Sequence, residues 1–366
     1  MRRMGSALEK PQDSRHRHPF NMPQIPVETE VSAEVLEQMF KRIQKQWEHL
    51  GVTEPYWSIV TQPQNQMDQF DQHREQFYAS GNGACQNLLA SLRRCGINPS
   101  QLNTCLEVGC GVGRITGFLA EAFSKVIAAD ISGEHLELAK THLVEKGVQN
   151  VELQHLLTID QIGELPQVDV IYSIITLQHN PPPVMAWMLS SLLSKLRAGG
   201  IAYIQIPTYK NGYLFEAERY LASEPPDTLE MHYLPQPDIF RLIAEADCVS
   251  LEVREDGMVP DEDKVLSNTF LVQKYWVIFM QVARKSLQAS SQLDASLAKR
   301  FTWLLGKDLQ NTFKTQDSPD SGCWWLVKIY QEYPVWAHAS PMQELKLLFE
   351  LVGKTTAARW KKGMCK

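Results

Sequence analysis

LEVGCGVGRIT, residues 106–116, is the stretch from which the architecture of this chain can be predicted. Glycines alternate with other residues at Gly109, Gly111 and Gly113, directly after a short apolar run that carries Glu107 near its end. Glycine permits backbone angles and close approaches that a Cβ atom forbids. A strand, a glycine-rich turn and a helix in this order are typical of a site that holds a nucleotide-like ligand at the edge of a parallel sheet.

Short apolar runs and amphipathic stretches alternate around and after this turn. Strands are expected at residues 104–109, 125–130, 151–155, 168–174 and 201–207, and helices at 114–123, 133–147, 182–200 and 237–247. The alternation predicts an α/β fold with a doubly wound, mostly parallel sheet that helices cover on both faces. Two more strands, 248–255 and 267–274, follow each other without a helix between them. We therefore expect seven strands, the last of them antiparallel to the rest.

The rest of the chain is expected to extend this domain. We expect a disordered leader at residues 1–30, a helical N-terminal extension or lid at 31–100, the ligand-binding domain at 101–275 and a C-terminal helical region at 276–366. The chain has 366 residues, 44% of them hydrophobic and 21% charged, which are ordinary values for a globular protein. These values exclude disorder of the whole chain.

Composition also bounds the class of partner. The formal net charge of −6 gives no electrostatic footprint for nucleic acid or for an anionic membrane. The seven cysteines are scattered without a CxxC pair, which argues against a disulfide framework and against a thiolate zinc site. We expect no metal, no secretory signal and no membrane span. The expectation is a cytoplasmic monomer or homodimer that acts on a small molecule.

Two ligand classes compete for the glycine turn. A dinucleotide site requires G-x-G-x-x-G, whose third glycine admits the pyrophosphate. Arg114 or Thr116 stands at that third position, depending on which glycine is counted first, so the dinucleotide pattern fails. Glu107 would repel a pyrophosphate but suits a ligand that carries an ammonium group.

The pattern E-x-G-x-G-x-G resembles motif I of the class I S-adenosylmethionine (SAM)-dependent methyltransferases, in their small-molecule or saccharide branch. The resemblance covers residues 106–274 and implies a Rossmann-like methyltransferase fold with SAM as the cofactor. It implies that Glu107 anchors the methionine ammonium and that the glycine turn cradles the cofactor. Further cofactor contacts are expected from Cys110, Ile131, Leu157 and Ser173.

Asp130 ends the second expected strand, at the spacing where an acidic side chain meets the ribose hydroxyls. A carboxylate can accept from both hydroxyls, so the residue type fits this task. The other reading of Asp130 is a helix N-cap, but Ser132 already fills that role. After the third strand, where family members often carry an acidic or amide side chain, this chain has Leu156, Leu157 and Thr158. Adenine is therefore expected to be held by apolar packing and backbone groups.

The residues just after the fourth strand are expected beside the acceptor by the same resemblance. If the acceptor is a hydroxyl, a base must take its proton, and histidine is suited to this near neutral pH. His179 is the first candidate, and His232, in the insertion after the fifth strand, is the second. The alternative for His179 is a histidine that only bonds the backbone and shapes the pocket.

Two rival functions stay open. A nicotinamide dehydrogenase would share the sheet, although Arg114 argues against it. A catalytically silent module of the same fold, serving as a partner-binding subunit, would have no need of Glu107, the glycines and Asp130 together. The resemblance favours an enzyme that methylates a small molecule, and the expected acceptor is a hydroxyl of a saccharide or of a secondary metabolite.

Overall fold

The computed structural model describes residues 25–225, 229–257 and 265–275. Most of the expected leader and the whole expected C-terminal helical region, residues 276–366, lie outside the described residues. The described end of the leader is extended, and Val27 forms an isolated parallel bridge with Phe215. None of the described helices is both long and apolar enough to cross a bilayer.

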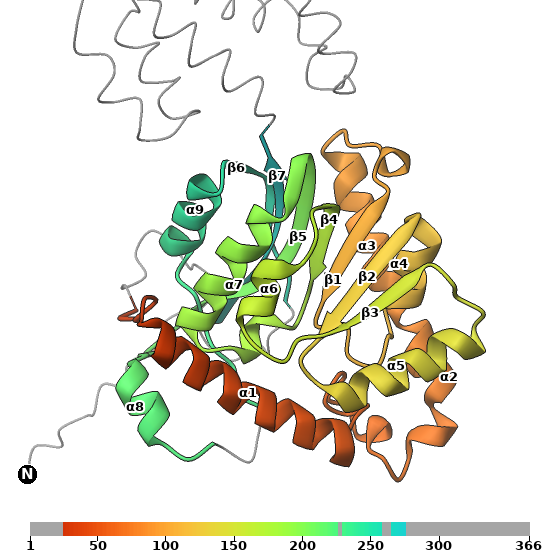
Figure 1. Cartoon of the computed structure of the whole chain (residues 1–366), viewed down its shortest axis with the longest axis horizontal. Coiled ribbons are helices and arrows are strands. Elements are labelled where there is room, and N and C mark those ends of the chain that lie inside the picture. The colour runs from red at the N-terminus through yellow and green to blue at the C-terminus, as the bar shows by residue number, and fades with distance from the viewer. Residues whose placement is uncertain (1–24, 226–228, 258–264, 276–366) are drawn as a thin grey trace, which may run out of the picture.

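The core of the described chain is a seven-stranded sheet (Figure 1). Its strands are β1 (Thr104–Val108), β2 (Lys125–Asp130), β3 (Val151–His155), β4 (Val168–Ser173), β5 (Leu196–Lys210), β6 (Cys248–Glu255) and β7 (Val265–Lys274). The spatial order is β3-β2-β1-β4-β5-β7-β6, in which β7 is antiparallel to both of its neighbours and the other pairs are parallel. The structure confirms the predicted doubly wound sheet with an antiparallel last strand.

Helices cover both faces of the sheet. The α-helices are α1 (Ala33–Thr53), α2 (Arg74–Ala79), α3 (Gly81–Arg94), α4 (Thr116–Ala122), α5 (Gly133–Glu145), α6 (Asp160–Glu164), α7 (Pro182–Ser194), α8 (Ala217–Ala222) and α9 (Gln236–Glu245). Short 3₁₀ turns lie at η2 (Pro63–Asn65), η3 (Phe70–Gln72), η4 (Pro99–Gln101) and η5 (Leu177–His179). Buried side chains of α3, α4 and α5 form one core cluster, and those of α1, α6, α7 and α9 form another. The sheet separates these two clusters.

The segment predicted as one helix forms helix α7 and the start of strand β5. The apolar pattern favours a helix over residues 182–200, and prolines at its start are well tolerated there. In the structure α7 ends at Ser194, and residues from Leu196 onward join β5. Gly199, with φ +77°, and Gly200 weaken a helix at this point, while Leu196 pairs with Val168 of β4. The prediction of a continuous helix was wrong because the pairing of strands outweighed the local pattern.

The N-terminal extension is built into the domain. Helix α1 crosses the lower edge of the sheet in Figure 1 and packs against α5, α7 and α8. Ser32 caps its first turn by accepting from Val35 N, and Leu36, Phe40 and Ile43 form its buried stripe. The extension thereby reaches the edge of the sheet where a ligand is expected.

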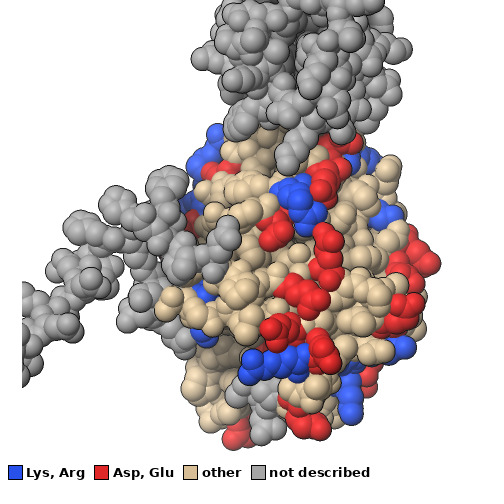
Figure 2. Space-filling model, turned by 90° about the vertical axis from the view of Figure 1, so that its left-hand side faces the viewer, with Lys and Arg blue, Asp and Glu red and all other residues tan. Residues whose placement is uncertain are grey.

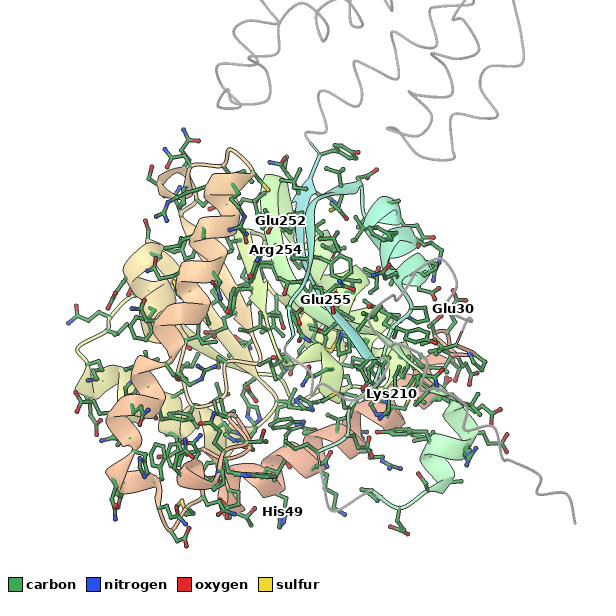
Figure 3. All side chains as sticks on the ribbon, turned by 180° about the vertical axis from the view of Figure 1, so that it is seen from behind. Glu30, His49, Lys210, Glu252, Arg254 and Glu255 are labelled. Atoms are coloured by element: carbon green, nitrogen blue, oxygen red, sulfur yellow. The ribbon has the colours of Figure 1, made fainter. Side chains whose placement is uncertain are left out.

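Strand β6 is the outermost strand on one flank of the sheet, and β3 is the outermost strand on the other. Glu252, Arg254 and Glu255 lie along it (Figure 3), and Arg254 and Glu255 are exposed. Arg94 of α3 donates to Glu252 through Nε (2.9 Å) and Nη2 (2.8 Å). Charged side chains on an edge strand discourage pairing with another chain, so this edge is protected against aggregation.

Candidate active site

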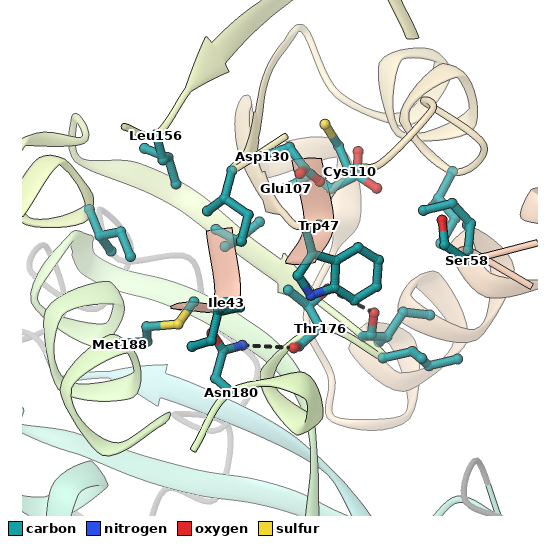
Figure 4. Close-up of a pocket in the computed structure, with 18 of the residues that line it drawn as sticks. Ile43, Trp47, Ser58, Glu107, Cys110, Asp130, Leu156, Thr176, Asn180 and Met188 are labelled. Atoms are coloured by element: carbon teal, nitrogen blue, oxygen red, sulfur yellow. Dashed lines mark hydrogen bonds between the residues drawn. The ribbon is translucent and has the colours of Figure 1, made fainter. Parts of the chain in front are cut away.

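A pocket lies at the carboxyl edge of β1, β2 and β4, where α1 forms one of its walls (Figure 4). Its volume is about 860 Å³, including the part that is open to solvent. The lining comes from α1, from the segment before α2, from the glycine turn and from the loops that follow β2, β3 and β4. In a doubly wound sheet this edge is where ligands bind.

The glycine turn has no room for side chains. Gly109 has φ +77°, and a Cβ atom there would lie 2.2 Å from Oγ1 of Thr176. Gly111 has φ +53°, and its Cβ would lie 2.4 Å from Cδ1 of Ile59. The turn is fixed to the sheet because Gly109 N donates to Ala129 O at 2.8 Å. Both glycines are therefore required by backbone angle and by space, which leaves backbone atoms as the floor of the pocket.

Asp130 presents a fixed carboxylate at the end of β2. Its Oδ2 accepts from Gly111 N at 2.8 Å and its Oδ1 accepts from Ser132 N at 2.9 Å. Ser132 is the N-cap of α5, as predicted, so Asp130 is not needed for that task. Each carboxylate oxygen keeps a lone pair for a further donor. The side chain lines the pocket and fits two neighbouring hydroxyl groups of a ligand.

Glu107 is a carboxylate in the interior, only 2% exposed. Burial raises its pKa to about 8, although the hydroxyl of Thr116, which donates to Oε2 at 2.6 Å, and the charge of Arg114 oppose this rise. A buried carboxylate with so little compensation favours a cation beside it. A ligand ammonium would fit beside Glu107.

Arg114 lines the same pocket, and sequence analysis used it only as an argument against a dinucleotide. Its Nη1 donates to Ser80 Oγ at 3.1 Å, while its Nε is buried and has no hydrogen-bond partner among the described residues. Burial lowers the pKa of the guanidinium. The positive charge of Arg114, close to Glu107, suits an anionic group of the same ligand. A ligand with a zwitterionic amino-acid end fits this pair of charges.

The loop after β4 holds a strained residue at the wall of the pocket. Ile175 has φ +54°, a left-handed conformation that β-branched residues rarely adopt. Its N–H donates to Oε1 of Gln205 at 2.9 Å, and Gln205 is fixed in turn by donating to Ser267 Oγ at 2.7 Å. Strain of this kind is typical of functional sites, where surrounding contacts hold the backbone in place.

One end of the pocket is apolar (Figure 4). It is lined by Phe40, Ile43, Leu156, Ile162 and Met188. These side chains come from α1, α6, α7 and the loop after β3. Such a surface suits the flat faces of a heteroaromatic ring, which agrees with the expectation of apolar packing around an adenine.

The same segment matches a known protein family. A family model described as a methyltransferase domain matches residues 105–200, which run from β1 into β5 and contain the glycine turn, Asp130 and the loop after β4.

The match assigns residues 105–200 to a methyltransferase domain.

Curated proteins that are similar to this chain carry the name ubiquinone biosynthesis O-methyltransferase. The protein from Acinetobacter baumannii is 24% identical over 180 residues, which cover 47% of this chain and 70% of the relative. The protein from Aeromonas salmonicida is 30% identical over 100 residues, which cover 27% of this chain and 41% of the relative.

Solved structures with a similar fold include two methyltransferases with a bound ligand. The magnesium protoporphyrin IX methyltransferase from Synechocystis PCC 6803 with bound SAM is 16% identical, with 68% of this chain and 100% of that chain covered and a TM-score of 0.45. The N-methyltransferase NodS from Bradyrhizobium japonicum WM9 with S-adenosylhomocysteine is 14% identical, with 63% and 98% covered and a TM-score of 0.41.

The residues of the pocket fit SAM, the cofactor that the sequence resemblance implies. The backbone floor at the glycine turn, the carboxylate of Asp130, the opposed charges of Glu107 and Arg114 and the apolar end match a nucleoside that carries an amino acid. Among the described residues, no group of three or more histidine, cysteine, aspartate or glutamate side chains could hold a metal ion.

Most of the cofactor residues expected from the sequence lie at this pocket. Its lining includes Glu107, Gly109, Cys110, Asp130 and Ile131. The glycine turn continues through Gly111, whose N–H donates to Asp130, and Gly113, which has φ +80° and packs against Ala139.

Two expected cofactor residues lie elsewhere. Ser173 is fully buried below the pocket and donates through Oγ to Val108 O at 3.0 Å, which joins β4 to β1. Leu157 is 52% exposed and outside the lining, whereas Leu156 beside it is buried and lines the pocket. Neighbouring side chains of an extended segment point to opposite sides, so only one of these leucines can face the ligand. The structure thus places Leu156 in the lining of the pocket, and the side chains of Leu157 and Ser173 outside it.

His179 is buried behind the wall of the pocket and is not among the lining residues. Its Nδ1 donates to the carbonyl of Glu230 at 2.8 Å, and its Nε2 faces Nε2 of Gln178 at 3.3 Å. Because a carbonyl only accepts, the proton is assigned to Nδ1. Burial lowers the pKa of His179 to about 4, so the ring is neutral near pH 7.

His232 belongs to a polar cluster in the insertion after β5. Its Nε2 lies 3.1 Å from Oε2 of Glu230, and its Nδ1 lies 2.8 Å from the hydroxyl of Tyr213. Tyr220 donates to the same Oε2 at 2.9 Å. Burial raises the pKa of Glu230, but hydrogen bonds from His232, Tyr220 and Arg42 outweigh it and lower the pKa to about 2. The carboxylate is therefore charged and orients His232.

Several residues of the site escaped the sequence analysis. They are Phe40, Ile43 and Trp47 of α1, together with Arg114 and Asn180 at the sheet edge. The amphipathic stripe of α1 was visible in the sequence, but its position over the pocket depends on contacts with distant residues. Arg114 could have been found, since a buried basic residue directly after a glycine turn suggests an anion.

Proposed function

We propose that this SAM-dependent methyltransferase transfers a methyl group to a hydroxyl of a small molecule. The observation that carries the proposal is one pocket that combines Glu107, Arg114 and Asp130 with the backbone of the glycine turn. Bound SAM supplies an activated methyl group, so the protein mainly has to align the acceptor and exclude water.

Within this proposal, each end of the cofactor has its own residues. Asp130 accepts hydrogen bonds from the ribose hydroxyls, and Glu107 balances the ammonium of the methionine end. Arg114, which lines the pocket, balances the charge of the carboxylate beside that ammonium. The apolar end, with Leu156 and Met188, packs on the adenine.

A hydroxyl acceptor is supported by the names of the relatives, which are O-methyltransferases. Removal of the acceptor's proton requires a base, and we assign this role to His232 ahead of His179. Glu230 fixes the N–H of His232 at Nε2, which leaves Nδ1 as the basic atom, and Nδ1 already accepts from the hydroxyl of Tyr213. The insertion that carries Tyr213 and His232 would then form the acceptor side, where a saccharide or another hydroxylated metabolite binds.

The proposal includes a cytoplasmic monomer or homodimer without a nucleic-acid or membrane partner. Figure 2 shows a face on which Asp and Glu side chains form a band, and such a surface repels polyanions. The described cysteines Cys85, Cys95, Cys105, Cys110 and Cys248 are free thiols. Burial raises the pKa of each of them, which keeps the thiols protonated and unreactive.

A product screen tests the proposed function. The protein is incubated with SAM that carries a labelled methyl group and with pools of hydroxylated metabolites, and products are detected by mass. We expect a labelled small molecule whose added methyl is on oxygen, and we expect no product with Asp130→Ala. Binding of SAM without any product from small-molecule pools would contradict the proposal and favour a catalytically silent module.

A further inference from the structure

Helix α1 lies outside the segment that matches the methyltransferase family, yet it closes one side of the cofactor pocket. The helix contributes Phe40, Ile43 and Trp47 to the lining, from one face and about one turn apart. Figure 4 shows Trp47 projecting into the pocket, whose lining also includes Glu107 and Thr176. Whatever fixes α1 therefore also fixes the shape of the pocket.

Arg42 connects this helix to the insertion that carries the proposed base. Its Nη2 donates to Oε1 of Glu230 at 3.0 Å, and its Nη1 donates to the carbonyls of Tyr220 at 2.6 Å and Ser223 at 2.7 Å. The guanidinium also lies over the ring of Tyr220, 4.1 Å from its centroid. The two side chains of the ion pair are only 13% and 10% exposed, so water screens their attraction weakly.

The backbone of Glu230 is held by His179, which lies behind the wall of the pocket. Its carbonyl accepts from Nδ1 of His179 at 2.8 Å. The ring of His179 packs edge-on against Trp47, with 5.2 Å between the ring centroids. The contacts Arg42–Glu230, Glu230–His179 and His179–Trp47 thus form a closed circuit that begins and ends on α1. We call these four residues the α1 circuit.

We propose that Arg42 is a positioning residue that holds α1 over the bound cofactor, so that release of SAM or of S-adenosylhomocysteine requires the α1 circuit to open. The inference rests on the cofactor pocket of the proposed function. A covered ligand leaves only when the covering element moves away, so contacts that fix this element slow dissociation. Arg42 contacts no pocket atom itself, and it acts through Glu230 and through the helix that carries Phe40, Ile43 and Trp47.

The test measures dissociation of S-adenosylhomocysteine from the full chain by stopped-flow competition, together with the dissociation constant by calorimetry. For Arg42→Ala we expect the dissociation rate to rise about tenfold and affinity to fall by a similar factor. Lys41→Ala is the matched control, because Lys41 neighbours Arg42 on α1 and its side chain is 67% exposed and pairs with Glu37. This control should change the dissociation rate by less than about twofold.

A double-mutant cycle separates this role from a general loss of structure. Glu230→Gln should raise the dissociation rate as Arg42→Ala does, and the double variant should be little faster than either single one. Arg42→Lys, which keeps the charge but loses the planar fork, should fall between wild type and Arg42→Ala and serves if Arg42→Ala does not fold.

Two results would overturn the inference. One is an unchanged dissociation rate in Arg42→Ala or Arg42→Lys, and the other is fully additive effects of Arg42 and Glu230 in the cycle. If wild-type protein does not bind S-adenosylhomocysteine at all, the proposed function itself fails, and this outcome is seen before any variant is made.

Discussion

Glu107 links the charge of the pocket to pH. Its pKa, raised to about 8 by burial, means that it is protonated at pH 6.5, with Arg114 and Asp130 as the nearest charged groups in the pocket. A ligand ammonium favours the ionised form, so binding of SAM at pH 6.5 should release up to about one proton. Calorimetry in two buffers of different ionisation enthalpy measures this release. Equal binding enthalpies in both buffers would show that Glu107 does not change its protonation.

The matched variant Glu107→Gln should release no proton and bind SAM more weakly. It should also stabilise the protein by itself. The folded-state pKa lies above the ordinary value of 4.5, so stability falls as pH rises from about 4.5 to 8, where the unfolded chain ionises and the folded one does not. The melting temperature of Glu107→Gln should therefore exceed that of wild type at pH 8, and the difference should shrink toward pH 5.

Arg114 is predicted to recognise the carboxylate of the cofactor. Arg114→Ala should weaken binding of SAM by roughly tenfold or more, because a buried charge-assisted hydrogen bond is lost. Decarboxylated SAM keeps the sulfonium and the ammonium but lacks the carboxylate, so its affinity should be nearly the same in wild type and in Arg114→Ala. Equal losses for both ligands would assign Arg114 to the fold and not to the ligand. Competition calorimetry distinguishes these outcomes.

At the scale of elements, the space around the glycine turn decides which residues it can contain. Gly109→Ala would place its Cβ against Thr176, at 2.2 Å from Oγ1 and 2.7 Å from Cβ, so the turn and the loop after β4 must separate. We expect loss of measurable SAM binding. Gly147→Ala is the control, since Gly147 has a similar φ of +69° but nothing within 4 Å of the added Cβ. It should lower the melting temperature and leave SAM affinity unchanged.

The sequence predicted those elements whose signal is local. The apolar runs, the glycine turn and the cap at Ser132 depend on residues close in the chain, and the structure agrees with them. The end of α7 was predicted wrongly, because the pairing of Leu196 with Val168 joins residues far apart in sequence. The extension at residues 31–100 was expected as a lid, but the helix that faces the pocket could not be named in advance, and neither could the contact of His179 with Glu230, because both depend on residues far apart in sequence.

At the scale of the whole molecule, the site is assembled from three parts of the chain. The methyltransferase segment, residues 105–200, supplies the floor and the charged groups. The N-terminal extension supplies α1, and the insertion after β5 supplies Glu230 and His232. A segment limited to the family match would therefore lack one wall of its pocket and the proposed base.

The proposed function requires that SAM and S-adenosylhomocysteine bind between Glu107 and Asp130. The most direct test is calorimetry of S-adenosylhomocysteine with the full chain and with Asp130→Ala, with NAD as a second ligand. We predict one ligand bound per chain with a micromolar dissociation constant, a dissociation constant at least about tenfold higher in Asp130→Ala, and no heat with NAD. The absence of binding to wild-type protein, or an affinity that Asp130→Ala leaves unchanged, would contradict it.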